Sequence, residues 1–162
     1  MALVDYFLKI DGVPGESQAD KHKDEIQVLS FSFGESQSGT MAFGGGGGAG
    51  KVQMQDFHFM MNVNKASPKL FLACATGEHI ANAILTARKA GKDQQDYLVI
   101  KFTDLLVSSF QTNGDANANS LPVDSISLNF AEIEVDYKIQ DNKGALGAST
   151  KVKYNLKEMK SK

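Results

Sequence analysis

The sequence lacks the features that mark disulfide-rich, metal-cluster and membrane proteins. It has one cysteine, Cys74, in 162 residues, which excludes an internal disulfide and a thiolate metal cluster. Cys74 lies in the apolar run 70–74, and this position predicts a small buried hydrophobic side chain. No run of about 18 apolar residues exists, so no membrane-spanning helix is expected.

The sequence is also poor in charge of one sign and in targeting signals. Its formal net charge is −2, and the absence of a basic stripe argues against a nucleic-acid-binding protein. Lysines gather in residues 151–162, where we expect a solvated face. The first residues show no basic start, apolar stretch or cleavage site, so we expect synthesis and folding in the cytoplasm.

What dominates the sequence is alternation of apolar and polar residues at every second position, which predicts strands. The length and the 42% hydrophobic content fit one domain, 1–162, with one core. We expect strands over about residues 4–10, 25–33, 52–63, 82–90, 97–112, 125–140 and 152–157, with a hairpin loop at 91–95.

Three of these expected strands change the face that carries their apolar residues. In strand 25–33 the change falls at Val28 and Leu29, which places Leu29, Phe31 and Phe33 together on a buried face. Strands 52–63 and 125–140 change in the same way. Such a change requires a bulge or a passage between sheets, as in strands that turn the corners of a barrel.

One segment has the pattern of a short helix. Ser67 is a suitable N-cap, Pro68 suits the first helical position and Gly77 suits the exit. Between them, Leu70, Phe71 and Cys74 share a face at helical spacing. The predicted fold is therefore mainly β, a small antiparallel barrel or two-sheet fold with one short flanking helix.

The glycine-rich segment 44–51 partly matches a phosphate-binding loop. That motif requires Ser or Thr after Lys51, and Val52 stands there instead. It also requires a following helix, whereas 52–55 has the alternation of a strand. Because glycine permits close backbone approach, we expect a neighbouring subunit to hold this segment.

The titratable residues form no recognisable catalytic or metal-binding constellation. None of the three histidines has a second ligand at metal-binding spacing; they are His22, His58 and His79. The polar segment 20–25 is expected to be a solvated loop. A row of carboxylates alternates along one strand and is explained by exposure; it consists of Glu132, Glu134 and Asp136. We expect no enzyme activity, cofactor or metal.

Several separated segments resemble one family in order and spacing, over about residues 2–140. They are 15–17, 25–26, 31–34, 36–39, 65–68, 73–77, 88–91, 107–109 and 127–131, with Asp20, His22 and Val28. On these residues the chain resembles the hemolysin-coregulated protein (Hcp) family, the tube proteins of bacterial type VI secretion systems. One departure is Phe33, where many members have Trp, and another hydrophobic residue there should preserve the core.

The resemblance implies a fold, an assembly and a set of partners. The fold is a phage tail-tube-like β-barrel with a flanking helix, and the assembly is a hexameric ring that stacks into a tube. The implied partners are further copies of the chain, effector proteins carried in the lumen, a spike protein of the valine-glycine repeat family and a contractile sheath. The family is secreted by the type VI system without a signal peptide.

Other functions remain open at this point. The chain could be a β-barrel cargo-binding protein or a phage- or pyocin-type tail-tube subunit. A phosphate-dependent enzyme that uses the glycine loop is a third hypothesis. Ring formation separates the tube subunit from a cargo-binding barrel and from the enzyme.

Two groups of residues are predicted to act in the assembly. We expect the loop 35–51 to contribute to ring stacking through Ser38, Gly39, Met41, Phe43, Gly44, Gly45, Gly46, Gly47, Gly48 and Lys51. Alternation with Leu29, Phe31 and Phe33 sends Ser30 and Ser32 to the opposite face, where we expect them to line the lumen. The tail 141–162 is less diagnostic.

Overall fold

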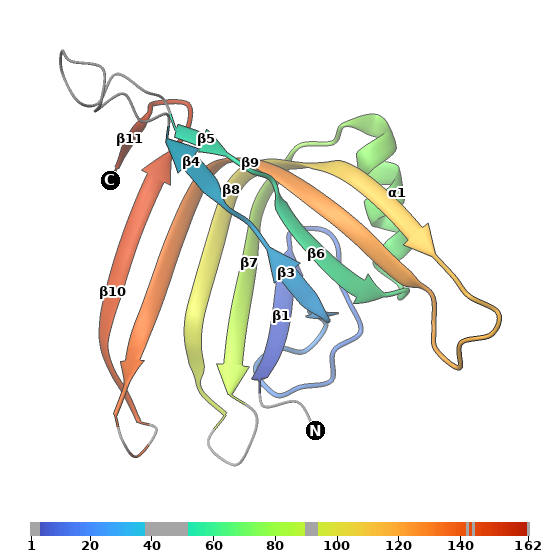
Figure 1. Ribbon diagram of the computed structural model, residues 1–162, viewed down its shortest axis with the longest axis horizontal. Helices are drawn as coiled ribbons and strands as arrows, with labels where there is room; N and C mark the ends of the chain where they lie inside the picture. The colour runs from blue at the N-terminus through green and yellow to red at the C-terminus, as the bar shows by residue number, and fades with distance from the viewer. Residues whose placement is uncertain (1–3, 38–51, 90–93, 142, 144, 162) are drawn as a thin grey trace.

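The computed structural model describes residues 4–37, 52–89, 94–141, 143 and 145–161, which form a mainly antiparallel β fold with one helix (Figure 1). The elements are β1 (Val4–Ile10), β2 (Ile26–Val28), β3 (Ser30–Ser32), β4 (Glu35–Gln37), β5 (Val52–Met54), β6 (Phe57–Asn62), α1 (Ser67–Thr76), β7 (Ile80–Lys89), β8 (Asp96–Asn113), β9 (Val123–Gln140), β10 (Leu146–Asn155) and β11 (Lys160–Ser161).

Two long strands, β8 and β9, hold the fold together. They pair antiparallel from Leu98↔Tyr137 to Asn113↔Val123. One half of this pair continues into a wall with β7, β1 and β10, and the other half pairs through β9 with β6 and then β3. A separate two-stranded ladder of β4 and β5 lies at the end of the molecule near the C-terminus (Figure 1).

The strand path bends sharply at Leu29 and does not close into a continuous ladder among the described residues. β2 pairs with β1, whereas β3, one residue later, pairs with β6. Leu29 lies between the two ladders and donates its N–H to the Met60 carbonyl oxygen at 2.8 Å. The expected burial of Leu29 was wrong, because its side chain is 51% exposed at this bend.

The other two expected changes of face are confirmed as breaks or transitions between walls. Residues 52–63 divide into β5 and β6 around Gln55 and Asp56. In β9 the buried residues shift from Phe130 to Ile133, where its partners change from β6 to β10. The final strand begins at Leu146, earlier than expected. Most of its side chains are exposed and its first half shows no alternation, so the sequence pattern did not reveal this start.

The core is built around phenylalanine side chains from both walls. Phe102 of β8 lies 4.7 Å from Phe57 and 4.8 Å from Phe130, measured between ring centroids. Phe33, at the position of the family tryptophan, is partly buried and packs against this core. Aromatic contacts at such distances stabilise a core beyond their buried area.

The helix packs on β8 but differs from its predicted form in two respects. Gly77 ends α1 in the left-handed conformation, as expected, with φ of 67°. The N-cap is Ala66, and Ser67 is the first helical residue. Phe71 is 59% exposed, whereas Leu70 and Ala73 are buried, so the covered stripe excludes Phe71. Cys74 is half-buried beside the core.

A buried carboxylate fixes the start of the helix to the sheet. Asp124 is fully buried and accepts hydrogen bonds from Ser67 Oγ at 2.6 Å and Thr112 Oγ1 at 2.7 Å. Ser67 therefore uses its hydroxyl for a tertiary contact in place of the expected cap. A buried charged group requires such partners to offset its loss of hydration.

We predict that Asp124→Ala destabilises the fold by about 2–4 kcal/mol, because it leaves two hydroxyl groups without their acceptor and opens a void. Urea denaturation should show a lower midpoint with an unchanged slope. Asn119→Ala, in an exposed loop, is the control and should change stability by less than about 0.5 kcal/mol. A wild-type midpoint for Asp124→Ala would contradict this role.

Candidate functional site

A polar face made of small neutral side chains extends over four strands. Ser30 and Ser32 of β3 are both exposed, on the face opposite the core as the alternation predicts. Their partners on β6 are Met60 and His58. The position of His58 between the buried Phe57 and Phe59 confirms that it also lies on the face away from the core.

This face continues across β9 and β8. His58 pairs with Ser127 and Met60 with Ser125, and these two serines pair with Ser109 and Gln111 of β8. We call this surface the serine face; its residues are Ser30, Ser32, His58, Met60, Ser108, Ser109, Gln111, Asn113, Ser125, Ser127 and Asn129. Sequence reasoning identified only the two β3 serines as site residues.

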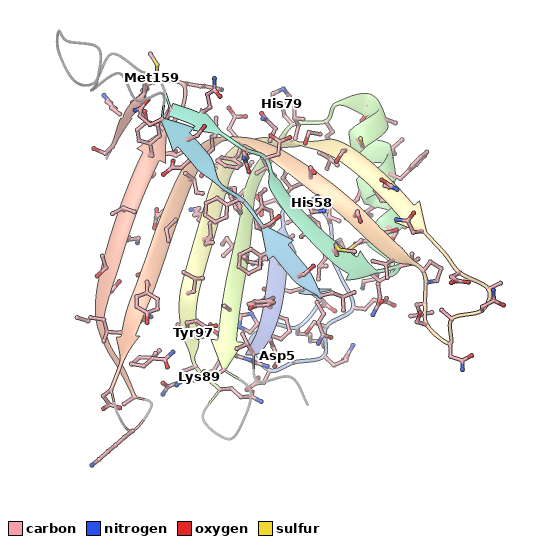
Figure 2. All side chains as sticks on the ribbon, viewed as in Figure 1. Asp5, His58, His79, Lys89, Tyr97 and Met159 are labelled. Atoms are coloured by element: carbon pink, nitrogen blue, oxygen red, sulfur yellow. The ribbon has the colours of Figure 1, made fainter. Side chains whose placement is uncertain are left out.

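Hydrogen bonds on the serine face hold its polar groups in fixed positions. Asp56 lies at the start of β6 and accepts from Ser108 Oγ at 2.6 Å and Asn129 Nδ2 at 2.8 Å. His58 Nδ1 lies 3.1 Å from Ser127 Oγ, and Figure 2 shows His58 along β6. Two hydrogen-bond donors thereby offset the charge of the Asp56 carboxylate, and the face offers mostly neutral hydroxyl and amide groups.

The row of carboxylates on β9 forms cross-strand ion pairs with β10. Lys151 Nζ lies 2.9 Å from Glu134, and Lys153 Nζ lies 3.2 Å from Glu132. The hydrogen bond that Lys151 donates to Glu134, together with the charge of that carboxylate, raises the pKa of Lys151 above its ordinary value. These carboxylates are half-buried and paired with lysines, an arrangement that stabilises the β9–β10 pair.

The polar segment 20–25 is not the solvated loop that was expected. His22 is 5% exposed and stacks on Phe7 with 4.6 Å between ring centroids. Its Nδ1 lies 2.9 Å from Glu25 and its Nε2 3.1 Å from Asp96. Because both carboxylates can only accept, both bonds form together when His22 carries two protons. This contact ties the segment to the β7–β8 hairpin.

A second charged cluster attaches the C-terminal segment to the irregular part of β8. Asp104 has a positive φ of 54° and accepts a hydrogen bond from Lys157 Nζ, with His79 Nδ1 at 3.4 Å. The bonds from Lys157 and His79 lower the pKa of Asp104. The cluster is exposed and has the character of a surface ion-pair network, which contributes little stability.

The sheet also has an uncovered apolar face at the far ends of β8, β9 and β10. Tyr137, Ile139 and Val152 are 44%, 52% and 61% exposed. Tyr137 and Val152 lie on the side of the sheet that faces the core, in neighbouring rows of paired residues. Burial, with the nearby Tyr6 and Tyr137, raises the pKa of Tyr97, which Figure 2 labels at this end of the sheet. We call Leu98, Val135, Tyr137, Ile139 and Val152 the open apolar face.

The open apolar face borders a small cavity between β4–β5 and β9–β10. This cavity has a volume of about 260 Å³ and is lined by Phe33, Met54, Ile133, Val135, Val152 and Tyr154, among others. In this part of the molecule the core therefore opens to the surface. Contiguous exposed apolar surface of this kind marks an interaction site in soluble proteins.

The ring-stacking residues between Ser38 and Lys51 lie outside the described residues, and their predicted role stays a prediction.

Described residues contain no group of three or more histidine, cysteine or acidic side chains that could hold a metal ion. The additional serines of β9 alternate with Ile126, Leu128 and Phe130, so the period-two pattern could have placed them on the polar face.

Comparison with known proteins identifies the family. The family described as "Type VI secretion system effector, Hcp" matches residues 7–137. The chain belongs to the Hcp family. It is 48% identical over 157 residues to Protein hcp1 of Pseudomonas aeruginosa PAO1, covering 96% of each chain.

Solved structures of Hcp proteins share the fold along the whole chain. Hcp1 from Salmonella typhimurium is 33% identical, with a TM-score of 0.82 over 99% of this chain and 100% of that one. A structure described as a type six secretion system protein is 31% identical, with a TM-score of 0.92 over 98% and 99%. The chain is therefore a structural, secreted protein of type VI secretion. The described part contains no helix long and apolar enough to span a membrane.

Proposed function

We propose that this Hcp protein is the structural subunit of a type VI secretion tube: it forms hexameric rings that stack into a tube and can carry effector proteins in the lumen. The observation that carries the proposal is the open apolar face. A monomer would leave Tyr137, Ile139 and Val152 exposed to water, and a neighbouring copy of the chain would cover them.

A ring is the assembly that this geometry favours. The open apolar face lies on β8, β9 and β10, toward one edge of the sheet, whereas β1 and β2 lie at the other end of the strand order. Contacts between two different surfaces of identical chains are heterologous, and they close into a ring when the rotation between neighbours allows it. Half-exposed strands such as β10 are also able to associate across subunits.

We predict that Val152→Lys shifts the protein from rings to monomers. An unpaired ammonium group buried in an apolar contact costs several kcal/mol, so association should weaken by at least about a hundredfold. Native mass spectrometry should show six times the 17.5 kDa chain mass for the wild type and the single chain for the variant. Gln18→Lys, which adds the same charge in an exposed loop, should keep the rings. A monomeric wild type at micromolar concentration would count against the tube.

The serine face fits the wall of the bore. A passage for many cargo proteins should be wettable and carry little fixed charge, because a dense lining of one sign would bind opposite charges too tightly and repel like ones. The serine face has this composition, whereas the face that carries Glu132, Glu134 and Asp136 is charged. We therefore assign Ser30 and Ser32, with the serines of β8 and β9, to the lumen.

We predict that Ser32→Gln reduces cargo binding without affecting the fold. The longer side chain projects from an exposed strand position, so stability should change by less than about 0.5 kcal/mol and rings should persist. Co-purification of effectors with the tagged protein from the producing bacterium should fall. Ser120→Gln, in the exposed β8–β9 loop, is the matched control. Normal effector recovery with Ser32→Gln would remove Ser32 from the cargo surface.

The glycine-rich segment is assigned to stacking between rings. β4 and β5 carry residues 38–51 between them and lie at the end of the molecule opposite the start of β1 (Figure 1). Stacking of rings head to tail requires a projection at one end and an acceptor at the other. The glycine-rich composition permits close approach of this segment to a neighbouring ring.

Deletion of residues 44–48 tests the stacking role. Rings should persist in native mass spectra, while tubes seen by electron microscopy and secretion through the type VI system should be lost. Loss of the ring itself would assign the segment to the lateral contact between subunits. Unchanged tubes and secretion would show that the segment has no part in stacking.

The proposed tube implies further partners and a location. The tube would contact a spike protein of the valine-glycine repeat family at its tip and a contractile sheath along its length. The subunit would be cytoplasmic before assembly and would leave the cell through the type VI system without a signal peptide. No catalytic role is assigned. The alternatives are a monomeric β-barrel that binds cargo, which lacks rings, and a phage- or pyocin-type tail-tube subunit, which lacks type VI secretion.

A further inference from the structure

Asn113 and Gly114 form an exposed Asn-Gly step at the end of β8. Asn113 is the last residue of the strand and pairs with Val123, and residues 111–122 are all exposed. We propose that Asn113 is a site of spontaneous chemical modification, at which water converts the side-chain amide to a carboxylate. The modification requires no enzyme and no assembly.

The reaction proceeds in two steps that use only the chain and water. In the first, the Gly114 backbone nitrogen loses its proton to base and attacks Cγ of Asn113. A bond forms between these two atoms, and Nδ2 leaves as ammonia after taking a proton. In the second, water adds to one of the two carbonyl carbons of the five-membered ring and opens it. The products are aspartate and isoaspartate, in which the main chain runs through Cβ.

The attacking nitrogen is available at this position. Within the described part of the chain, the Gly114 N–H donates to no protein acceptor. Gly114 has no side chain to obstruct the ring, and as glycine it reaches backbone conformations that other residues avoid. The nearest atoms to an added Cβ would belong to Pro122, at 3.8 Å, so the space around the peptide bond is open.

A neighbouring side chain favours the attack on the amide carbon. Gln111 Nε2 lies 3.3 Å from Asn113 Oδ1 and donates a hydrogen bond to it. This donor draws electron density from Cγ and stabilises the negative charge that develops on the oxygen during attack. Gln111 thus acts as a positioning and polarising residue for the reaction.

Another asparagine in the same loop lacks these conditions. Asn117 is followed by Ala118, whose Cβ crowds the ring. The Ala118 N–H donates to the Asp115 carbonyl oxygen at 3.2 Å, so the nitrogen that would attack is engaged. Asn117 N–H itself is held by Asp115 Oδ1 at 2.9 Å. The structure therefore distinguishes two exposed asparagines only four residues apart.

The modification changes both the charge and the backbone of the protein. The formal net charge falls from −2 to −3, because a neutral amide becomes a carboxylate. The isoaspartate product inserts a methylene group into the main chain where Asn113 pairs with Val123. If the serine face lines the bore, a consequence that depends on the proposed function, each modified subunit adds a negative charge there. The modification itself does not depend on that function.

The test is a time course on the purified full-length protein, incubated in mildly alkaline buffer. Peptide fragmentation in the mass spectrometer should locate at residue 113 the mass change of an amide becoming a carboxyl group. Chromatography should separate an aspartate and an isoaspartate product. The rate should rise with pH, because the deprotonated backbone nitrogen is the nucleophile.

Gly114→Ala should slow the modification at least about tenfold, which corresponds to a barrier higher by about 1.4 kcal/mol. Its side chain fits the structure, so folding should be unchanged. Gln111→Leu should also slow it, and an unchanged rate would overturn the part assigned to Gln111. No modification at Asn113, equal rates at Asn113 and Asn117, or a wild-type rate in Gly114→Ala would overturn the proposal. None of these outcomes depends on whether rings or tubes form.

Discussion

The pairing of β8 with β9 is the constraint on which the rest of the structure depends. Each strand has 18 residues, and their antiparallel register runs from Leu98↔Tyr137 to Asn113↔Val123. One half of the pair joins β7 and β10, and the other half joins β6. A register shift between Val107 and Ser109 and the positive φ of Asp104 mark the region of transition. Because side chains alternate along a strand, such irregularities change the residues that face the core.

This arrangement produces surfaces of different chemistry from the same two strands. At one end the core side of β9 remains uncovered, and Tyr137 and Ile139 are exposed. At the other end the outward side carries Ser125 and Ser127, with Ser109 beside them. The protein's chemistry therefore lies in extended surfaces, as expected for a chain that assembles with copies of itself. The proposed ring uses the first surface for contact and the second for the bore.

Buried polar groups fix segments that the strand ladders leave free. Asp124 holds the first turn of α1, and His22 holds the segment before β2 against the β7–β8 hairpin through Glu25 and Asp96. Removal of one member of such a network leaves its partly buried partners without their hydrogen bonds. These contacts position the helix and the long loop, while buried apolar side chains, Phe57, Phe59 and Phe102 among them, form the core.

The sequence by itself determined most of the strands, the helix exit at Gly77 and the family, because alternation, glycine at a left-handed position and motif order are local properties. The strands Glu35–Gln37, inside the predicted loop, and Lys160–Ser161 were not expected. Only the tertiary structure decided what covers each face. Leu29 and Phe71 match the apolar pattern yet are exposed, whereas His22 looks polar and is buried. Alternation indicates that the two faces of a strand differ in polarity, but the burial of a face depends on whether another element packs against it. The joining of Ser30 and Ser32 to the serines of β8 and β9 likewise required the register between strands distant in sequence.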